Sequence, residues 1–231
     1  MRQHVNTIIA TSDPLGHLEY LERFVAYATG VKADAVVVLG NLLAERAGDR
    51  TYGTLFKLLA GIGLPTFFVP GPLDVPMQEY LWEAANIETA APYLHGVHST
   101  FAFAPGYVVF TGFGGTIVDD VQTVREEREA LRYPGWEVEY RLRFLSELKD
   151  YQKVFLFTTM PAHKGRHEPG SQVLAEVVKS YRPRLVLVGG QEEHRQEFLG
   201  KSLVVMPGRL SRGEFSKIDL YAHTVQANVL E

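Results

Sequence analysis

The densest group of reactive side chains in this 231-residue chain lies between Met160 and Glu168, where His163, Lys164, Arg166 and His167 share one short segment. Imidazole, ammonium and guanidinium groups all donate hydrogen bonds to phosphate and carboxylate oxygens. The composition predicts a loop that holds an anionic ligand. The alternative interpretation is an ordinary polar surface loop before the next helix.

A second group of metal-binding side chain types is spread along the chain. His17 and His194, together with His163 and Asp13, are residues of the kind that bind transition metals. They predict a metal site only if the fold brings them together. The alternative is that these histidines are exposed or cap helix ends.

Strand-like and helix-like segments alternate through the first third of the chain, and this alternation indicates a parallel sheet with right-handed crossovers. The expected strands are residues 5–10, 33–39 and 66–69. The expected helices are residues 17–27, 52–59 and 76–85. The second strand is apolar on both faces, as expected of a central parallel strand.

The remainder of the chain predicts a second group of strands with helices outside it. Runs at 93–97, 99–103 and 107–112 are separated by Gly or Pro and predict antiparallel pairing. Residues 114–133 predict a long loop with some helix. Further helices are expected at 136–148 and 172–180, and further strands at 153–157, 185–188, 197–199, 203–206 and 215–221. We expect one two-sheet domain over residues 1–231.

Composition narrows the function classes. The apolar content of 46% with 22% charged residues is typical of a globular protein, and the net charge of −4 argues against a general nucleic-acid binder. The chain has no cysteine, no signal-peptide pattern and no apolar run long enough to span a membrane, so we expect a cytoplasmic protein without membrane contact. Aromatic residues such as Trp82, Trp136 and Tyr140 are candidates for a homo-oligomer interface.

Several loops that follow expected strands occur in a recognisable order: Thr11–Gly16, Leu39–Asn41, Val69–Asp74, Thr158–Pro161 and Val188–Glu192. This order resembles that of the calcineurin-like metallophosphoesterases, whose loops read D-x-H, G-D, G-N-H-D/E, a lone H before a Pro, and G-H-x-H, and hold two metal ions. The segment Val205–Leu210 is similar to the closing N-P-G-S-L turn of that family, without its asparagine. The resemblance covers nearly the whole chain and implies an α/β fold, a four-layer αββα sandwich of two mixed β-sheets flanked by helices.

Most metal ligands implied by the resemblance are replaced. Asp13 matches the first carboxylate, Asn41 stands at the bridging aspartate, and Glu192 replaces a histidine of G-H-x-H. The other expected ligand positions hold Leu15, Pro72, Leu73, Thr158 and Gly190. Two adjacent cations need an anionic bridge and imidazole or carboxylate ligands. We therefore expect no cofactor beyond one weakly bound Mg²⁺, Mn²⁺ or Ca²⁺ on Asp13, Asn41 and Glu192.

Asp74 matches the acidic end of the G-N-H-D loop. We expect it to act structurally, as an acceptor for backbone N–H groups where the helix opens near Pro76.

These observations favour a phosphoesterase-fold protein that binds a phosphorylated or anionic small molecule, such as a nucleotide, without efficient hydrolysis. One alternative is a residual divalent-metal-dependent phosphoesterase or phosphodiesterase with a cation on Asp13 and Asn41. Another is a non-catalytic interaction or scaffold subunit. The resemblance implies a hydrolase, whereas the loss of ligands argues against two-metal catalysis, so enzymatic activity stays undecided at this level.

Overall fold

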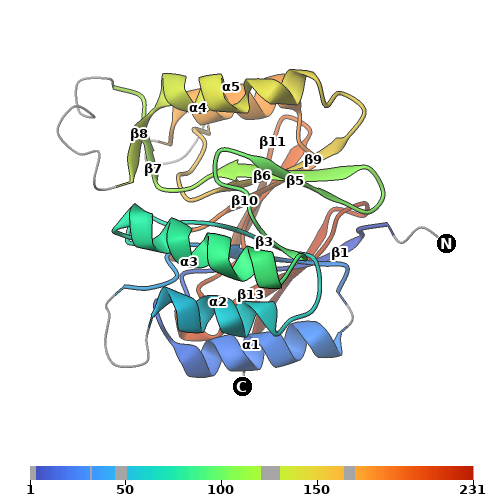
Figure 1. Cartoon of the computed structure of the whole chain (residues 1–231). Helices are drawn as coiled ribbons and strands as arrows, with labels where there is room; N and C mark the ends of the chain where they lie inside the picture. Colours follow the sequence, from blue (N-terminus) through green and yellow to red (C-terminus); the bar gives the residue numbers. More distant parts are fainter. Residues whose placement is uncertain (1–3, 32, 45–50, 121–130, 164–169, 231) are drawn as a thin grey trace.

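Two six-stranded mixed sheets face each other and carry helices on their outer sides, in a computed structural model that describes residues 4–31, 33–44, 51–120, 131–163 and 170–230 (Figure 1). The first sheet has the order β14 (Thr224–Val229), β13 (Glu214–Asp219), β1 (Thr7–Ser12), β2 (Ala35–Leu39), β3 (Thr66–Val69) and β4 (Leu94–Gly96). The second has the order β11 (Arg195–Leu199), β12 (Ser202–Met206), β10 (Leu185–Val188), β9 (Gln152–Phe157), β6 (Val108–Phe113) and β5 (Phe101–Ala104).

Each sheet has a parallel centre and antiparallel additions. Strands β1 to β4 are parallel, as are β6, β9, β10 and β12. Strand β13 pairs antiparallel with β1, and β5 and β11 close the second sheet in the same way. The predicted mixed α/β sandwich is therefore confirmed.

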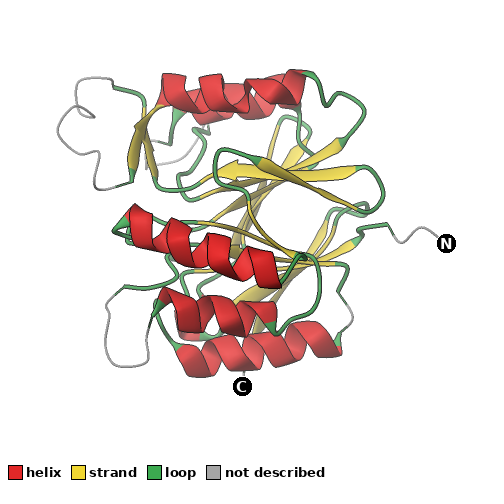
Figure 2. Cartoon of the chain, viewed as in Figure 1, coloured by secondary structure: helices red, strands yellow, loops and turns green. Residues whose placement is uncertain are grey.

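The helices form the two outer layers, as Figure 2 shows. Helices α1 (Leu18–Gly30), α2 (Tyr52–Ala60) and α3 (Met77–Ala90) cover the first sheet, and α4 (Gly135–Leu142) and α5 (Gln172–Tyr181) cover the second. Short 3₁₀ helices are η3 (Arg143–Ser146) and η4 (Leu210–Arg212). Ser171 caps α5, because its side chain accepts a hydrogen bond from the Leu174 backbone N–H at 3.2 Å.

Three apolar clusters hold the layers together. The central one lies between the sheets and includes Phe67 and Phe110, whose rings stack with centroids 3.8 Å apart. The other two lie under the helices, where Phe24 and Phe56 face the first sheet and Val178 faces the second. Strand β2 has helices on one face and the second sheet on the other, so its run of valines is fully buried. This explains why the strand is apolar on both faces.

Some expectations from the sequence were wrong. Strand β4 does not pair antiparallel with its neighbours in sequence but lies parallel to β3 in the first sheet. The segment expected as a loop contains two short parallel strands, β7 (Thr116–Val118) and β8 (Arg132–Pro134). Strand β14 was not expected, because its side chains are mostly exposed at a sheet edge and lack an apolar pattern.

Within the described part of the chain, no helix is both long and apolar enough to cross a membrane.

Candidate functional site: strand-end loops with an arginine beside a buried carboxylate

The carboxyl ends of the central strands of both sheets meet at one edge of the molecule. The Asp13 backbone N–H donates to the Leu39 carbonyl at 3.1 Å, which joins the loop after β1 to the end of β2. The Thr158 hydroxyl, after β9, donates to the Gly115 carbonyl at 2.9 Å and lies 3.4 Å from the Pro70 carbonyl, which follows β3. Loops from both sheets therefore form one site, as expected for an α/β sheet.

The Asp13 carboxylate is buried at the centre of this site and has a full set of hydrogen-bond donors. One oxygen, Oδ1, accepts from the Asn41 backbone N–H at 3.3 Å and from Asn41 Nδ2 at 2.8 Å. The other, Oδ2, accepts from the Ser12 hydroxyl at 2.9 Å and the Gly190 backbone N–H at 3.1 Å. The Ser12 hydroxyl has one hydrogen, which it shares with the Gly208 carbonyl at 3.0 Å. Three N–H groups and this shared hydroxyl therefore surround the carboxylate, which has about four lone-pair positions.

Asn41 is oriented by both sides of its amide. Its Nδ2 group donates to Asp13, while its Oδ1 atom accepts from the Leu73 backbone N–H at 2.7 Å. The residue that replaces the expected bridging aspartate therefore uses its oxygen to tie together the loops after β2 and β3. Asn41 lies next to Asp13, as the order of the loops in the sequence predicts. Its amide makes hydrogen bonds that hold the loops in place.

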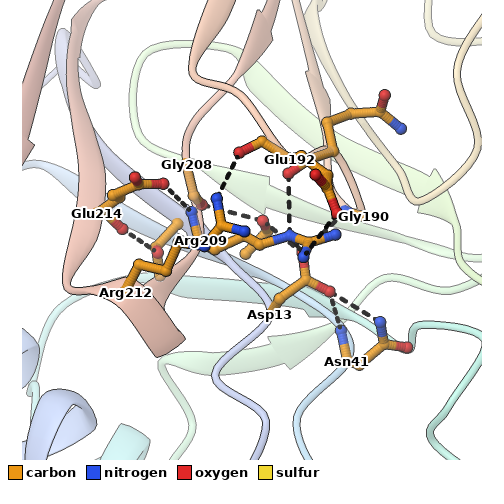
Figure 3. A network of polar contacts seen from close by, with 11 residues as sticks. Asp13, Asn41, Gly190, Glu192, Gly208, Arg209, Arg212 and Glu214 are labelled. Atoms are coloured by element: carbon orange, nitrogen blue, oxygen red, sulfur yellow. Dashed lines mark hydrogen bonds and ion pairs between the residues drawn. The ribbon is translucent and has the colours of Figure 1, made fainter.

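The residue that sequence analysis missed is Arg209, which lies in the loop between β12 and η4. Its Nε atom is 3.8 Å from Asp13 Oδ2, and its Nη1 atom is 3.7 Å from Glu192 Oε1 (Figure 3). Arg209 Nε also donates to the Gln191 carbonyl at 3.2 Å. A guanidinium therefore stands beside the carboxylate that the family resemblance assigns to a metal ion. The sequence feature that could have pointed to Arg209 is its position in the closing turn, Val205–Leu210, where it is the basic residue.

The backbone around Arg209 holds it in this place. The Ser12 backbone N–H donates to the Gly208 carbonyl at 3.0 Å, and Arg209 N donates to the Glu214 carboxylate at 3.1 Å. Gly208 has a φ of +92°, and a Cβ at this position would lie 2.7 Å from the Glu214 Cβ. Only glycine fits this turn without strain, and the turn directs Arg209 toward Asp13.

A second guanidinium lies next to the same loop. Arg212 Nη1 donates to the Glu192 carbonyl at 3.2 Å, and the Arg212 side chain is exposed. The Glu192 side chain is 76% exposed, so its carboxylate is an outer partner of Arg209 and not a buried one. Arg209, with 22% of its side chain exposed, lies between the buried Asp13 and the solvent-facing Glu192 (Figure 3).

Asp74 has a structural role, but with other partners than those predicted. Its carboxylate accepts from the backbone N–H groups of Leu42, Leu43 and Gly71 at 2.8 to 3.1 Å. The start of α3 has no side-chain cap. Complete burial raises the Asp74 pKa from 3.8 to about 7, against the lowering effect of these backbone hydrogen bonds. Asp74 therefore braces the loops after β2 and β3.

The predicted histidines bind other groups. His163 Nε2 lies 3.2 Å from the Phe198 carbonyl, and His194 Nε2 lies 2.8 Å from the Ser216 hydroxyl. Burial lowers the pKa of His194. His17 precedes α1, where its side chain makes no cap hydrogen bond and its ring centroid lies 6.2 Å from that of Tyr20. Among the described residues, no three His, Asp or Glu side chains form a group able to hold a metal ion, so the displaced site is not assembled there.

The remaining members of the predicted anion-binding loop, Lys164, Arg166 and His167, lie outside the described residues. His163 is the described member of that group, and its hydrogen-bond contact is with strand β11.

The residues present do not fit the two-metal centre of the family. Asp13 accepts hydrogen bonds from three N–H groups and faces the shared Ser12 hydroxyl, and Asn41 uses its oxygen on the Leu73 backbone N–H. The positive charge of Arg209 lies beside the same carboxylate and would repel a cation there. No catalytic step through metal ions follows from this arrangement.

The family and the fold were tested by comparison with known proteins. A model of the family described as "Metallophosphoesterase, calcineurin superfamily" matches residues 45–230. TT1561 of Thermus thermophilus has a crystal structure that is 48% identical, with a TM-score of 0.91, covering 99% of this chain and 100% of that one. The comparison with curated proteins returned no match.

More distant solved structures share the fold alone. A novel archaeal phosphodiesterase is 13% identical with a TM-score of 0.55, covering 97% of this chain and 99% of that one. GAP50, the anchor in the inner membrane complex of Plasmodium, is 10% identical with a TM-score of 0.55, covering 98% of this chain and 88% of that one. The fold occurs in a phosphodiesterase and in an anchor protein, so the activity must be argued from the site. The chain belongs to the metallophosphoesterase family of the calcineurin superfamily.

Proposed function

We propose that the site at the strand ends binds a phosphorylated or otherwise anionic small molecule through Arg209 and Arg212, without efficient hydrolysis. The observation that carries this proposal is the guanidinium of Arg209 beside Asp13, at the place where the family resemblance implies a metal ion. A guanidinium and a metal ion both attract phosphate oxygens. Only the metal ion also lowers the pKa of a bound water to make a hydroxide nucleophile.

Arg209 has hydrogen-bonding capacity for such a ligand. Its Nε–H group is used by the Gln191 carbonyl, while the 3.7 Å separation of Nη1 from Glu192 exceeds a normal hydrogen bond. In the described part of the chain, the terminal nitrogens of Arg209 have no other hydrogen-bond partner. A planar guanidinium with free N–H groups on one side is suited to bidentate contact with a phosphate or carboxylate.

Glu192 and Arg212 set how the ligand would enter. Among the described residues, the largely exposed Glu192 side chain has only a loose ion pair, with Arg209, so an incoming oxyanion can replace it there. Arg212, anchored to the Glu192 carbonyl, supplies a second positive charge next to the same loop. A nucleotide or another phosphorylated metabolite is the class of ligand that these charges favour.

Calorimetric titration of the purified chain with inorganic pyrophosphate and with adenosine monophosphate tests this proposal. We expect Arg209→Gln to weaken binding by about tenfold or more, since a hydrogen bond to a charged group contributes about 1.5–3 kcal/mol. Arg143→Gln is the matched control, because Arg143 lies on η3 with its guanidinium over the Tyr140 ring. Equal affinity of the wild type and Arg209→Gln for both probes would reject the proposal.

Two further measurements on the same purified chain distinguish the residual hydrolase. It requires divalent-dependent turnover of an activated phosphodiester and retention of metal after desalting, measured by mass spectrometry. Two metal equivalents per chain with turnover would contradict a binding protein and would mean that residues outside the described set complete a metal centre. A scaffold subunit would bind neither probe.

A further inference from the structure

A groove of about 200 Å³ lies between α3 and the segment 96–100, and none of Asp13, Glu192 and Arg209 lines it. Its apolar floor includes Phe68, Pro70, Tyr80 and Ala84. Its polar side chains are those of Glu88, His98 and Thr100. This volume is below the range of about 300–1,000 Å³ that is usual for drug-sized ligands, so the groove admits only a small molecule.

Glu88 is a half-buried carboxylate without a cationic partner in the described part of the chain. Its Oε1 atom accepts from the Gly96 backbone N–H at 2.7 Å, which ties the C-terminal part of α3 to β4. Burial raises the pKa of Glu88. Buried carboxylates are usually paired with a cation or several donors. The described residues supply one donor to Glu88, so its carboxylate has acceptor capacity left over.

Gly96 brings the Glu88 carboxylate and the apolar floor close together. A Cβ at Gly96 would lie 2.9 Å from Glu88 Oε1 and 3.2 Å from the Phe68 ring. Because glycine leaves this space open, the carboxylate lies next to the aromatic floor and not out in solvent.

The other polar groups of the groove are neutral. His98 Nδ1 accepts from the Gly114 backbone N–H at 3.0 Å, so the hydrogen of the neutral ring is on Nε2 and that atom is a donor. Burial, with a smaller effect from Arg141, lowers the His98 pKa to about 4. The Tyr80 hydroxyl is buried and has no hydrogen-bond partner among the described residues. Glu88 therefore supplies the charge of this groove.

We propose that this groove is a second binding site, for a small planar molecule that presents a cationic or amino N–H edge to Glu88. The flat body of such a ligand would lie against the floor formed by Phe68, Pro70 and Tyr80, and its N–H groups would reach the carboxylate. Amidines, amino-substituted heterocycles and the amino edge of a nucleobase share this chemistry. The groove is separate from the arginine site, whose ligands are anions.

Benzamidine is the probe, because it combines a ring with a planar cationic edge. We measure its affinity for the full-length chain by calorimetry and by ligand-observed NMR, with benzoate as an anion of the same size. We expect benzamidine to bind and benzoate not to bind at this groove. Glu88→Gln should weaken benzamidine binding by about tenfold or more, because the charged acceptor is lost while Gln can still accept from Gly96.

Two further variants keep the result independent of folding effects. Ala85→Trp fills the groove from the exposed side of α3 and should abolish binding. Glu83→Gln, on the same helix but not among the residues that line the groove, should leave affinity unchanged. The proposal is overturned if benzamidine at millimolar concentration does not bind the wild type. It is also overturned if Glu88→Gln and Ala85→Trp bind benzamidine as tightly as the wild type does, or if Glu83→Gln loses as much affinity as Glu88→Gln. Arg209→Gln should not affect benzamidine, which separates this site from the proposed function.

Discussion

Substitution of Asp13 by Ala should destabilise the protein strongly, whether or not the protein is an enzyme. The substitution removes an acceptor from the Asn41 backbone N–H, from Asn41 Nδ2 and from the Gly190 backbone N–H. The Ser12 hydroxyl keeps the Gly208 carbonyl as a partner at 3.0 Å, so it is not left without an acceptor. The substitution also leaves the positive charge of Arg209 without its inner carboxylate.

The expected loss follows from these groups. An orphaned buried donor costs about 1–3 kcal/mol, and breaking a buried ion pair from one side costs about 3–5 kcal/mol in total. Partial entry of water favours the lower figure of about 1 kcal/mol for each of the three orphaned donors. The ion pair is 3.8 Å long and Arg209 is partly exposed, so its loss should add only about 1 kcal/mol, which gives about 4 kcal/mol in all. Asp13 also has a φ of +48°, which Asn tolerates better than Ala, so part of the loss is specific to Ala.

Urea denaturation followed by circular dichroism measures this loss, with Asp13→Asn as the comparison. Asn keeps the side-chain shape and one carbonyl oxygen for the Asn41 donors, so its loss should be smaller than that of Ala. A change below about 0.5 kcal/mol for Asp13→Ala would mean that the carboxylate does not organise these loops. The result also bears on enzymology, because loss of turnover in Asp13→Ala would not by itself identify a metal ligand.

Three further predictions concern stability. The pKa of Asp74 is raised from 3.8 to about 7 in the folded protein, so between these pH values the folded protein holds a proton that the unfolded chain releases. The Asp74 contribution to stability is therefore present below about pH 4 and is lost as the pH rises toward 7, by up to about 1.4 kcal/mol per pH unit. Urea denaturation of the wild type and of Asp74→Asn at several pH values measures this contribution as the difference between the two proteins. Gly114→Ala should cost at least about 2 kcal/mol of stability, because the new Cβ would overlap the Pro70 carbonyl oxygen. In the control Gly30→Ala, in α1, the new Cβ meets no atom within 4 Å, so this substitution should be neutral or slightly stabilising. Equal melting temperatures of the two variants would contradict this packing. Ser171→Ala should cost about 1–3 kcal/mol, because it removes both the α5 cap and the hydrogen bond that the Ser171 hydroxyl donates to Asp119 Oδ1 at 2.6 Å. An unchanged melting temperature would exclude both roles.

Much of the fold was predictable because local patterns and tertiary packing agree. The apolar run that forms β2 is buried on both faces, and Thr66–Val69 is a parallel strand as expected. Leu185–Val188 is a strand as expected, and it pairs parallel with β9. The partner of a strand was harder to predict. Leu94–Gly96 joins β3 and not the following strands, because short runs carry no information on which sheet edge is free.

The positions of some strand-end residues were predicted from the order of the loops. Asp13 and Asn41 do lie together at the strand ends, and Thr158 lies across from Pro70. Their roles could not be predicted, because the same residue types serve as metal ligands or as hydrogen-bond partners depending on the donors that surround them. His17, His163 and His194 could not be placed from spacing, because the partners of His163 and His194, Phe198 and Ser216, lie 35 and 22 residues away.

The sequence by itself determined the layered α/β architecture and the loss of the family's imidazole ligands, because both depend on residue types at the ends of recognisable strands. Only the tertiary structure decided which charged side chain lies beside Asp13. Strand β13 pairs antiparallel with β1, and this pairing brings the turn at Gly208 and Arg209 beside Ser12 and Asp13, with Ser12 and Gly208 196 residues apart in the chain. A contact of that kind depends on how the sheet closes, which no local pattern of apolar residues specifies.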